Sequence, residues 1–92
     1  MPGDTVARRV VVSGHVQGVF FRDQTRRTAH RHGVAGWVRN CADGTVEAHL
    51  EGPAEAVAEV VRWCRQGPRH ATVYELRVRD AEPEGLGGFQ IR

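Results

Sequence analysis

The chain has 92 residues, of which 40% are hydrophobic and 26% charged, and its formal net charge is +2. This length suits one compact domain over residues 1–92, and the balanced composition excludes intrinsic disorder and a fibrous architecture. The sequence lacks the run of about 20 apolar residues that spans a bilayer, and it begins without a basic region followed by an apolar one. We therefore expect a cytoplasmic protein that makes no membrane contact, and the small basic excess is too weak to predict a nucleic-acid partner.

The first predicted elements are a strand and a helix. Arg9–Ser13 is a short β-branched run bounded by Gly14, which indicates a buried strand. Phe21–His32 contains neither Gly nor Pro and ends in three basic or histidine residues just before Gly33. Basic residues in a last turn and a glycine just beyond it are typical of a helix C-terminus, so this segment is predicted to be helical.

Two strands and a second helix follow. Val34–Asn40 and Thr45–Leu50 are predicted strands, and Asp43-Gly44 between them is a hairpin signal. The second helix is predicted to begin with Pro53 as its first helical residue and to end at Gly67-Pro68. Its predicted buried face has the i, i+3, i+4, i+7 spacing and consists of Val57, Val60, Val61 and Cys64.

The last predicted elements are strands at Val73–Arg79 and Phe89–Arg92. The first alternates, with Tyr74, Leu76 and Val78 on one face and charged residues on a solvated face. The order of strands and helices predicts an α+β fold, a ferredoxin-like βαββαβ sandwich. In this fold two helices pack on one face of a mostly antiparallel sheet, here of four or five strands.

A glycine-bounded turn, Gly14–Arg22, connects the first strand to the first helix. Free backbone N–H groups in such a turn, together with the positive end of the helix dipole, can cradle a dianionic phosphoryl group. Arg22 would strengthen this cradle, because a planar guanidinium can bind two phosphate oxygens at once. The glycine spacing alone fits neither the Walker A pattern nor the dinucleotide-binding fingerprint.

The complete string resembles the acylphosphatase signature Gly-x-Val-Gln-Gly-Val-x-(Phe/Tyr)-Arg. A second pattern of that family, Gly-aromatic-Val-x-Asn-x-x-Asp-Gly-x-Val-Glu, is also met, and the resemblance extends over nearly the whole chain. The matching residues are Gly14, Val16, Gln17, Gly18, Val19, Phe21 and Arg22 in the first pattern and Gly36, Trp37, Val38, Asn40, Asp43, Gly44, Val46 and Glu47 in the second.

This resemblance implies an enzyme that hydrolyses acyl phosphates to a carboxylate and inorganic phosphate. It implies that Arg22 binds the phosphoryl group and that Asn40 orients the attacking water. The loop amides implied to share in phosphate binding are those of His15, Val16, Gln17, Gly18, Val19, Phe20 and Phe21. The family needs no metal or organic cofactor, and the sequence offers no carboxylate cluster or His/Cys ligand set. We expect a monomer whose partner is a small-molecule acyl phosphate.

The implied reaction is consistent with these residue types. The leaving carboxylate has a conjugate acid with a pKa of about 4, so no general acid is required. The loose transition state of phosphoryl transfer mainly needs in-line positioning and stabilisation of charge on the phosphoryl oxygens. Because the amide of Asn40 can accept a hydrogen bond from water but cannot take its proton, our hypothesis is that a phosphoryl oxygen takes it.

Other functions remain as alternatives. An RNA-recognition module shares the order of elements, but it needs exposed aromatic residues on its central strands, and Arg9–Ser13 and Thr45–Leu50 contain none. A phosphate-binding module without turnover, or an acylphosphatase-like domain of a larger carbamoyl-transfer protein, is a further possibility. The chain length and the presence of both Arg22 and Asn40 argue against these two.

The histidine and cysteine residues near the two patterns have simpler interpretations. We expect His15 to be an exposed loop residue and not a general base. Cys41 and Cys64 are far apart in the sequence, without further ligands nearby, so they are predicted to be reduced thiols, with Cys64 in the core.

Overall fold

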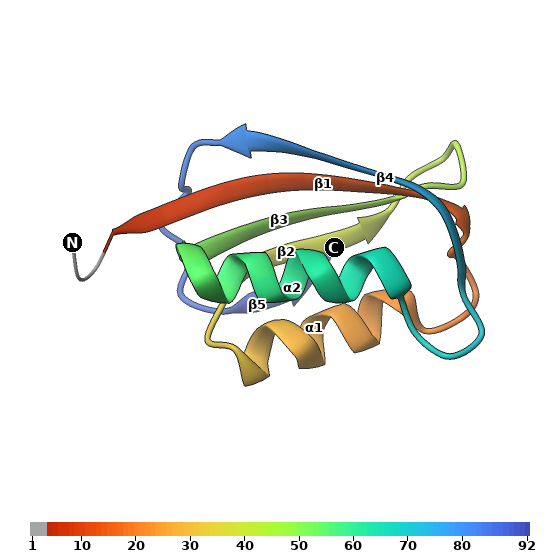
Figure 1. Ribbon diagram of the computed structural model, residues 1–92, viewed down its shortest axis with the longest axis horizontal. Coiled ribbons are helices and arrows are strands. Elements are labelled where there is room, and N and C mark those ends of the chain that lie inside the picture. The colour runs from red at the N-terminus through yellow and green to blue at the C-terminus, as the bar shows by residue number, and fades with distance from the viewer. Residues whose placement is uncertain (1–3) are drawn as a thin grey trace.

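The computed structural model describes residues 4–92 and consists of a five-stranded sheet with two helices packed on one face (Figure 1). In chain order the elements are β1 (Thr5–His15), α1 (Phe21–Arg31), β2 (Ala35–Asn40), β3 (Val46–Pro53), α2 (Ala54–Gln66), β4 (Thr72–Ala81) and β5 (Phe89–Ile91). The strand order is β4-β1-β3-β2-β5, and among these strands only β5 pairs in parallel, with β2. The predicted ferredoxin-like sandwich is confirmed.

The core lies between the helices and the inner face of the sheet. Alternate residues of the three central strands point toward the helices, because side chains in a strand alternate between its two faces. On α2, the residues at helical spacing that meet them are Val57, Val60 and Cys64, all buried. The buried sheet residues on this face are Val10, Val12, Val38, Val46, Ala48 and Leu50.

The ends of several elements differ from the prediction. β1 extends well beyond Arg9–Ser13 because it pairs with β3 on one side and β4 on the other. The prediction that Pro53 is the first helical residue is wrong, because Pro53 has φ −58° and ψ 142° and caps the N-terminus of α2 from the end of β3. α1 ends one residue early, at Arg31, with His32 as its C-cap.

The predicted inward position of Tyr74 on β4 is also wrong, since Tyr74 is 78% exposed. The register changes at this point: Ser13 pairs with Glu75, but Gly14 pairs with Val73, which leaves Tyr74 as the extra residue of a β-bulge. The bulge reverses the alternation of β4, and Val73 packs against the core in place of Tyr74. The bulge lies opposite Ser13 and Gly14, close to the end of β1 at His15, where the predicted phosphate-binding residues begin.

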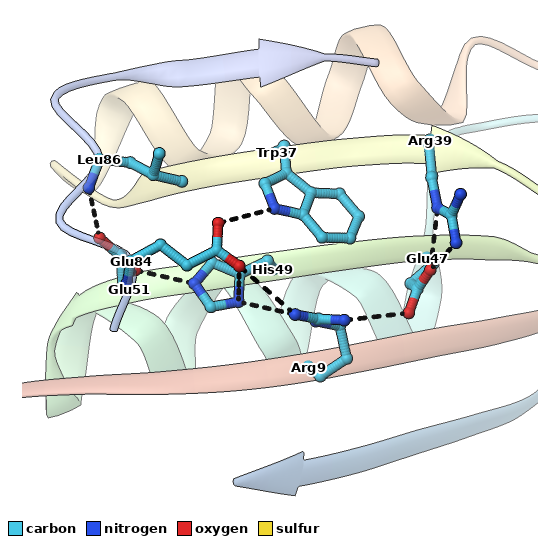
Figure 2. A network of polar contacts seen from close by, with 8 residues as sticks. All are labelled: Arg9, Trp37, Arg39, Glu47, His49, Glu51, Glu84 and Leu86. Carbon is cyan, nitrogen blue, oxygen red and sulfur yellow. Dashed lines mark hydrogen bonds and ion pairs between the residues drawn. The ribbon is translucent and has the colours of Figure 1, made fainter. Parts of the chain in front are cut away.

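The outer face of the sheet carries a polar network that holds the β4–β5 connection in place (Figure 2). The buried carboxylate of Glu51 accepts hydrogen bonds from the backbone N–H groups of Glu84 and Leu86, both at 2.7 Å. Nε2 of His49, which is completely buried, lies 2.8 Å from Glu51 Oε2, and Trp37 Nε1 donates to Glu84 at 3.3 Å. This network ties residues 82–88 to β3 and so places β5 beside β2.

Burial of Glu51 disfavours its ionised form, but the hydrogen bonds from the amides of Glu84 and Leu86 and from His49 outweigh that effect. The pKa of Glu51 is therefore lowered from its ordinary value. A carboxylate that is ionised, buried and fully hydrogen-bonded stabilises the folded state at neutral pH.

Candidate active site

The loop between β1 and α1 is anchored by two buried valines and has two exposed residues between and after them. Val16 and Val19 are buried, whereas Gly18 and Phe20 are exposed. Among the described residues, no other protein group accepts a hydrogen bond from the backbone N–H groups of residues 16–20. Gly18 has φ 77°, a left-handed conformation that suits glycine. The loop thus presents free N–H donors at the N-terminus of α1, where the helix dipole favours an anion.

Phe20 has an unusual backbone conformation at the N-cap of α1. Its φ of 65° and ψ of 24° lie in the left-handed region, and among the described residues other than glycine it is the only one with positive φ. Such a conformation costs a bulky residue on the order of 1–3 kcal/mol. The residue is 77% exposed, so burial of its side chain in the protein does not offset this cost.

Arg22 lies in the first turn of α1 and is exposed. Its neighbour Asp23 forms ion pairs with Arg26 at 3.2 Å and with Arg27 at 3.1 Å. No carboxylate among the described residues pairs with Arg22 within 4.0 Å, so its guanidinium is available to an external anion.

Asn40 is the last residue of β2, and it lines the same cavity as Arg22. The Oδ1 atom of Asn40 is buried and has no hydrogen-bond partner among the described residues. Leaving such an acceptor unpaired costs about 1–3 kcal/mol, so this atom favours a ligand or water that donates a hydrogen bond. The cavity has a volume of about 290 Å³ and is lined by Val16, Gly18, Phe20, Phe21, Arg22, Asp23, Asn40 and Ile91.

The side chain of Gln17 connects the loop to the β2–β3 turn. Its Nε2 donates to the carbonyl oxygens of Cys41 at 2.8 Å and Thr45 at 3.0 Å. Both acceptors belong to the turn that directly follows Asn40, and loop and turn lie at the same end of the molecule (Figure 1). Gln17 therefore fixes the position of the free amides relative to Asn40.

The turn itself is held by Asp43. Its Oδ1 accepts hydrogen bonds from the hydroxyl of Thr45 at 2.7 Å and from the Thr45 backbone N–H at 3.0 Å. These two bonds lower the pKa of Asp43. A turn stabilised in this way gives Gln17 a fixed anchor.

Most of the residues that the sequence predicted come together around this one cavity. Val16, Gly18, Phe20, Phe21, Arg22 and Asn40 line it. His15, Gln17 and Val19 do not: His15 is exposed at the end of β1, Gln17 reaches the turn, and Val19 is buried.

Two lining residues, Asp23 and Ile91, are not among those predicted from the sequence. Asp23 follows Arg22 directly and could have been found from that position. Ile91 reaches the cavity because it pairs in parallel with Val38 of β2, a pairing for which the sequence carries no local signal.

The two cysteines are free thiols, as predicted, and burial raises the pKa of the Cys64 thiol to about 12. Over residues 4–92, no three His, Cys, Asp or Glu side chains are grouped to hold a metal ion. Within the same range, neither helix is long and apolar enough to cross a membrane.

Comparison with known proteins assigns the family. The acylphosphatase family model matches residues 8–91. The chain belongs to the acylphosphatase family. The acylphosphatase of Rubrobacter xylanophilus is 59% identical over 86 residues, which cover 91% of this chain and 77% of that protein. The acylphosphatase of Gloeobacter violaceus is 56% identical over 86 residues, covering 94% of this chain and 92% of that protein.

A solved structure of an acylphosphatase from Coxiella burnetii superimposes with a TM-score of 0.93 at 32% identity, over 97% of this chain and 94% of that one. The enzyme class that the two sequence patterns predicted is thus confirmed. Its substrate, by family, is a small-molecule acyl phosphate.

Proposed function

We propose that this acylphosphatase cleaves the carboxyl-phosphate bond by in-line attack of a water held by Asn40 on a phosphoryl group bound by Arg22 and the loop amides. The observation that carries the proposal is the shared cavity. It joins an unpaired guanidinium, unpaired backbone N–H groups and the buried, unpaired Oδ1 of Asn40. The first two bind an anion, and the third is an acceptor for a water proton.

The charges around the cavity support phosphate binding. The guanidinium of Arg22 can donate two hydrogen bonds to phosphoryl oxygens, and the first turn of α1 adds the positive end of its dipole. The carboxylate of Asp23 would repel phosphate, but it is neutralised by its ion pairs with Arg26 and Arg27. The net local charge therefore favours a dianionic group.

In the proposed step, the water oxygen forms a bond to phosphorus while the bond between phosphorus and the acyl oxygen breaks. The acyl group leaves as a carboxylate, which needs no proton because its conjugate acid has a pKa of about 4. The proton lost by the water passes to a phosphoryl oxygen, since the amide of Asn40 cannot accept it. The products are a carboxylate and inorganic phosphate, and the donors on the phosphoryl oxygens stabilise the charge that develops there.

The test is hydrolysis of benzoyl phosphate by the purified protein in EDTA, with inorganic phosphate as a competitive inhibitor. Arg22→Ala should weaken phosphate inhibition and lower kcat/KM by about 10²–10³, the effect of removing one donor to a developing oxyanion. Arg22→Lys should be more active than Arg22→Ala but less active than wild type, because an ammonium does not bind two oxygens in a plane. Arg65→Ala, which removes an exposed arginine in the last turn of α2, is the matched control.

Asn40→Ala should lower kcat by about 10²-fold while phosphate inhibition changes little, because its role is to position the water. If folded wild-type protein bound phosphate without hydrolysing benzoyl phosphate, the alternative of a binding module without turnover would replace this proposal. A kcat that follows an enzyme pKa abolished by replacing one histidine would contradict the absence of a general base.

The RNA-recognition alternative gains no support from the sheet. Within β1 and β3, the residues with aromatic rings are His15, which is exposed at the very end of β1, and His49, which is completely buried, so the middle of these strands exposes no ring. Exposed rings for stacking bases are what such a module requires. The monomeric state, the cytoplasmic location and the single-domain organisation stay predictions.

A further inference from the structure

The cavity is lined by two exposed apolar side chains from segments far apart in the sequence. Phe20, at the N-cap of α1, is 77% exposed, and Ile91, in β5, is 41% exposed; both line the cavity. The polar lining residues Arg22 and Asn40 are assigned to the phosphoryl group and the water. The apolar pair lines the same cavity and has no role in the chemistry at phosphorus.

The backbone conformation of Phe20 indicates that its exposed ring has a function. Two residues of the β1–α1 loop, Gly18 and Phe20, have a left-handed backbone conformation. At Gly18 the residue is glycine, which adopts this conformation without strain. At Phe20 the chain instead keeps a large side chain that is strained and exposed. Packing within the protein does not explain that choice, because most of the ring faces solvent. Backbone strain of this kind clusters at binding and catalytic sites.

We propose that Phe20 and Ile91 form an acyl subsite that selects acyl phosphates with aromatic or bulky apolar acyl groups over those with small ones. This inference rests on the proposed function, since it needs the phosphoryl group to lie at Arg22. The ring and the aliphatic side chain would cover the acyl group of the bound substrate and remove apolar surface from water. The subsite acts on the part of the substrate that leaves, so it changes selectivity between acyl groups and not the route of the reaction.

The polar network on the outer face of the sheet supports the same assignment. Ile91 is held beside β2 by parallel pairing with Val38, and Arg92 N–H donates to the Val38 carbonyl at 2.9 Å. The connection that leads into β5 is fixed by Glu51 through two backbone hydrogen bonds (Figure 2). The fold therefore fixes the position of Ile91 in the proposed subsite before a substrate binds.

The test measures kcat/KM for benzoyl phosphate and for acetyl phosphate, which share the anhydride and differ in the acyl group. Each variant is judged by its benzoyl-to-acetyl ratio relative to wild type, so the different intrinsic reactivities of the two substrates cancel. Phe20→Asn removes the ring and keeps a residue that tolerates the left-handed conformation, and Ile91→Ala removes the aliphatic wall. Val78→Ala, which removes a partly exposed aliphatic residue of β4, is the matched control.

We expect the ratio to fall about tenfold in both variants, at the lower end of the roughly 10- to 200-fold discrimination that apolar contacts provide. The Val78→Ala ratio should stay at the wild-type value. Phe20→Gly is a second variant for the loop position: it relieves the strain, so its melting temperature should not fall, yet its ratio should fall as for Phe20→Asn.

A ratio that stays within twofold of wild type in either Phe20→Asn or Ile91→Ala would overturn the acyl subsite, as would an equal change in Val78→Ala. An equal loss for both substrates leaves the ratio unchanged and assigns Phe20 to the phosphate loop alone. Wild-type protein that hydrolyses neither substrate would instead refute the proposed function. The two failures are therefore distinguishable.

Discussion

Replacing Gln17 by Met tests whether the loop and the turn must be held together for catalysis. The change keeps the length of the side chain and removes the donor that binds the carbonyl oxygens of Cys41 and Thr45. A hydrogen bond of this kind contributes about 0.5–1.5 kcal/mol net. Both carbonyls keep a backbone donor, from Gly44 at 3.1 Å and from Cys41 at 2.8 Å, so neither is left unpaired. We therefore expect Gln17→Met to lower the free energy of unfolding by about 1–2 kcal/mol.

The effect on catalysis should be larger than this loss of stability suggests. Gln17 binds the turn that directly follows Asn40, so without it the water-holding amide can shift relative to the phosphate loop. A displacement of about 1 Å can cost 10²-fold in rate. We expect kcat for benzoyl phosphate to fall about 10- to 100-fold. The inhibition constant of inorganic phosphate should change less, because Arg22 and the loop amides stay in place.

Urea unfolding, steady-state kinetics and phosphate inhibition measure the three quantities. Gln66→Met, which changes an exposed glutamine at the end of α2, is the control and should alter none of them. If Gln17→Met lowered the free energy of unfolding as expected but left kcat unchanged, the two hydrogen bonds of Gln17 would have only a structural role. A fall in kcat without any loss of stability would show that the two hydrogen bonds are not what positions Asn40.

Three further predictions concern the scaffold. Glu51→Gln should destabilise the protein by about 3 kcal/mol in urea unfolding, because it removes a buried, paired charge, whereas Glu59→Gln on the surface should cost no more than about 0.5 kcal/mol. Because the folded pKa of Glu51 is lowered, its contribution is fully present above the ordinary carboxyl pKa of 4.5 and is lost as pH falls through the folded value. Below pH 4.5, stability should therefore decrease less steeply in Glu51→Gln than in wild type. Gly14→Ala should cost about 3 kcal/mol or block folding, as its Cβ would lie 2.1 Å from a backbone oxygen of β4. Thiol labelling at pH 8 should modify Cys41 in the native protein and Cys64, whose pKa is about 12, only after unfolding.

The order of elements was predictable because its signals are local. Alternation in Thr45–Leu50 and the turn at Asp43-Gly44 indicate a hairpin wherever the rest of the chain lies. The error at Pro53 has a simple cause: proline has nearly the same φ as an N-cap and as a first helical residue, and only ψ separates the two positions. Local sequence does not determine that angle.

Features that depend on pairing between distant segments were not predictable. The bulge that turns Tyr74 outward depends on the register between β4 and the end of β1. The alternation around His49 gives no indication that Glu84, from the β4–β5 connection, approaches this buried side chain to 3.9 Å. In the site, Arg22 and Asn40 were found because family patterns contain them, whereas the wall formed by Ile91 depends on the parallel pairing of β5.

The central place of β1 in the sheet has a consequence for how the protein folds. Val10 pairs with Ala48 on one side and with Val78 on the other. β1 therefore pairs only with segments that are distant from it in the sequence. Closing such long loops costs entropy before any contact compensates for it, and folding rates fall as contacts become more distant in sequence. We expect this enzyme to fold slowly for its length. During synthesis its sheet can close only after β4 has emerged from the ribosome, so β1, although made first, stays without one of its two partners until then.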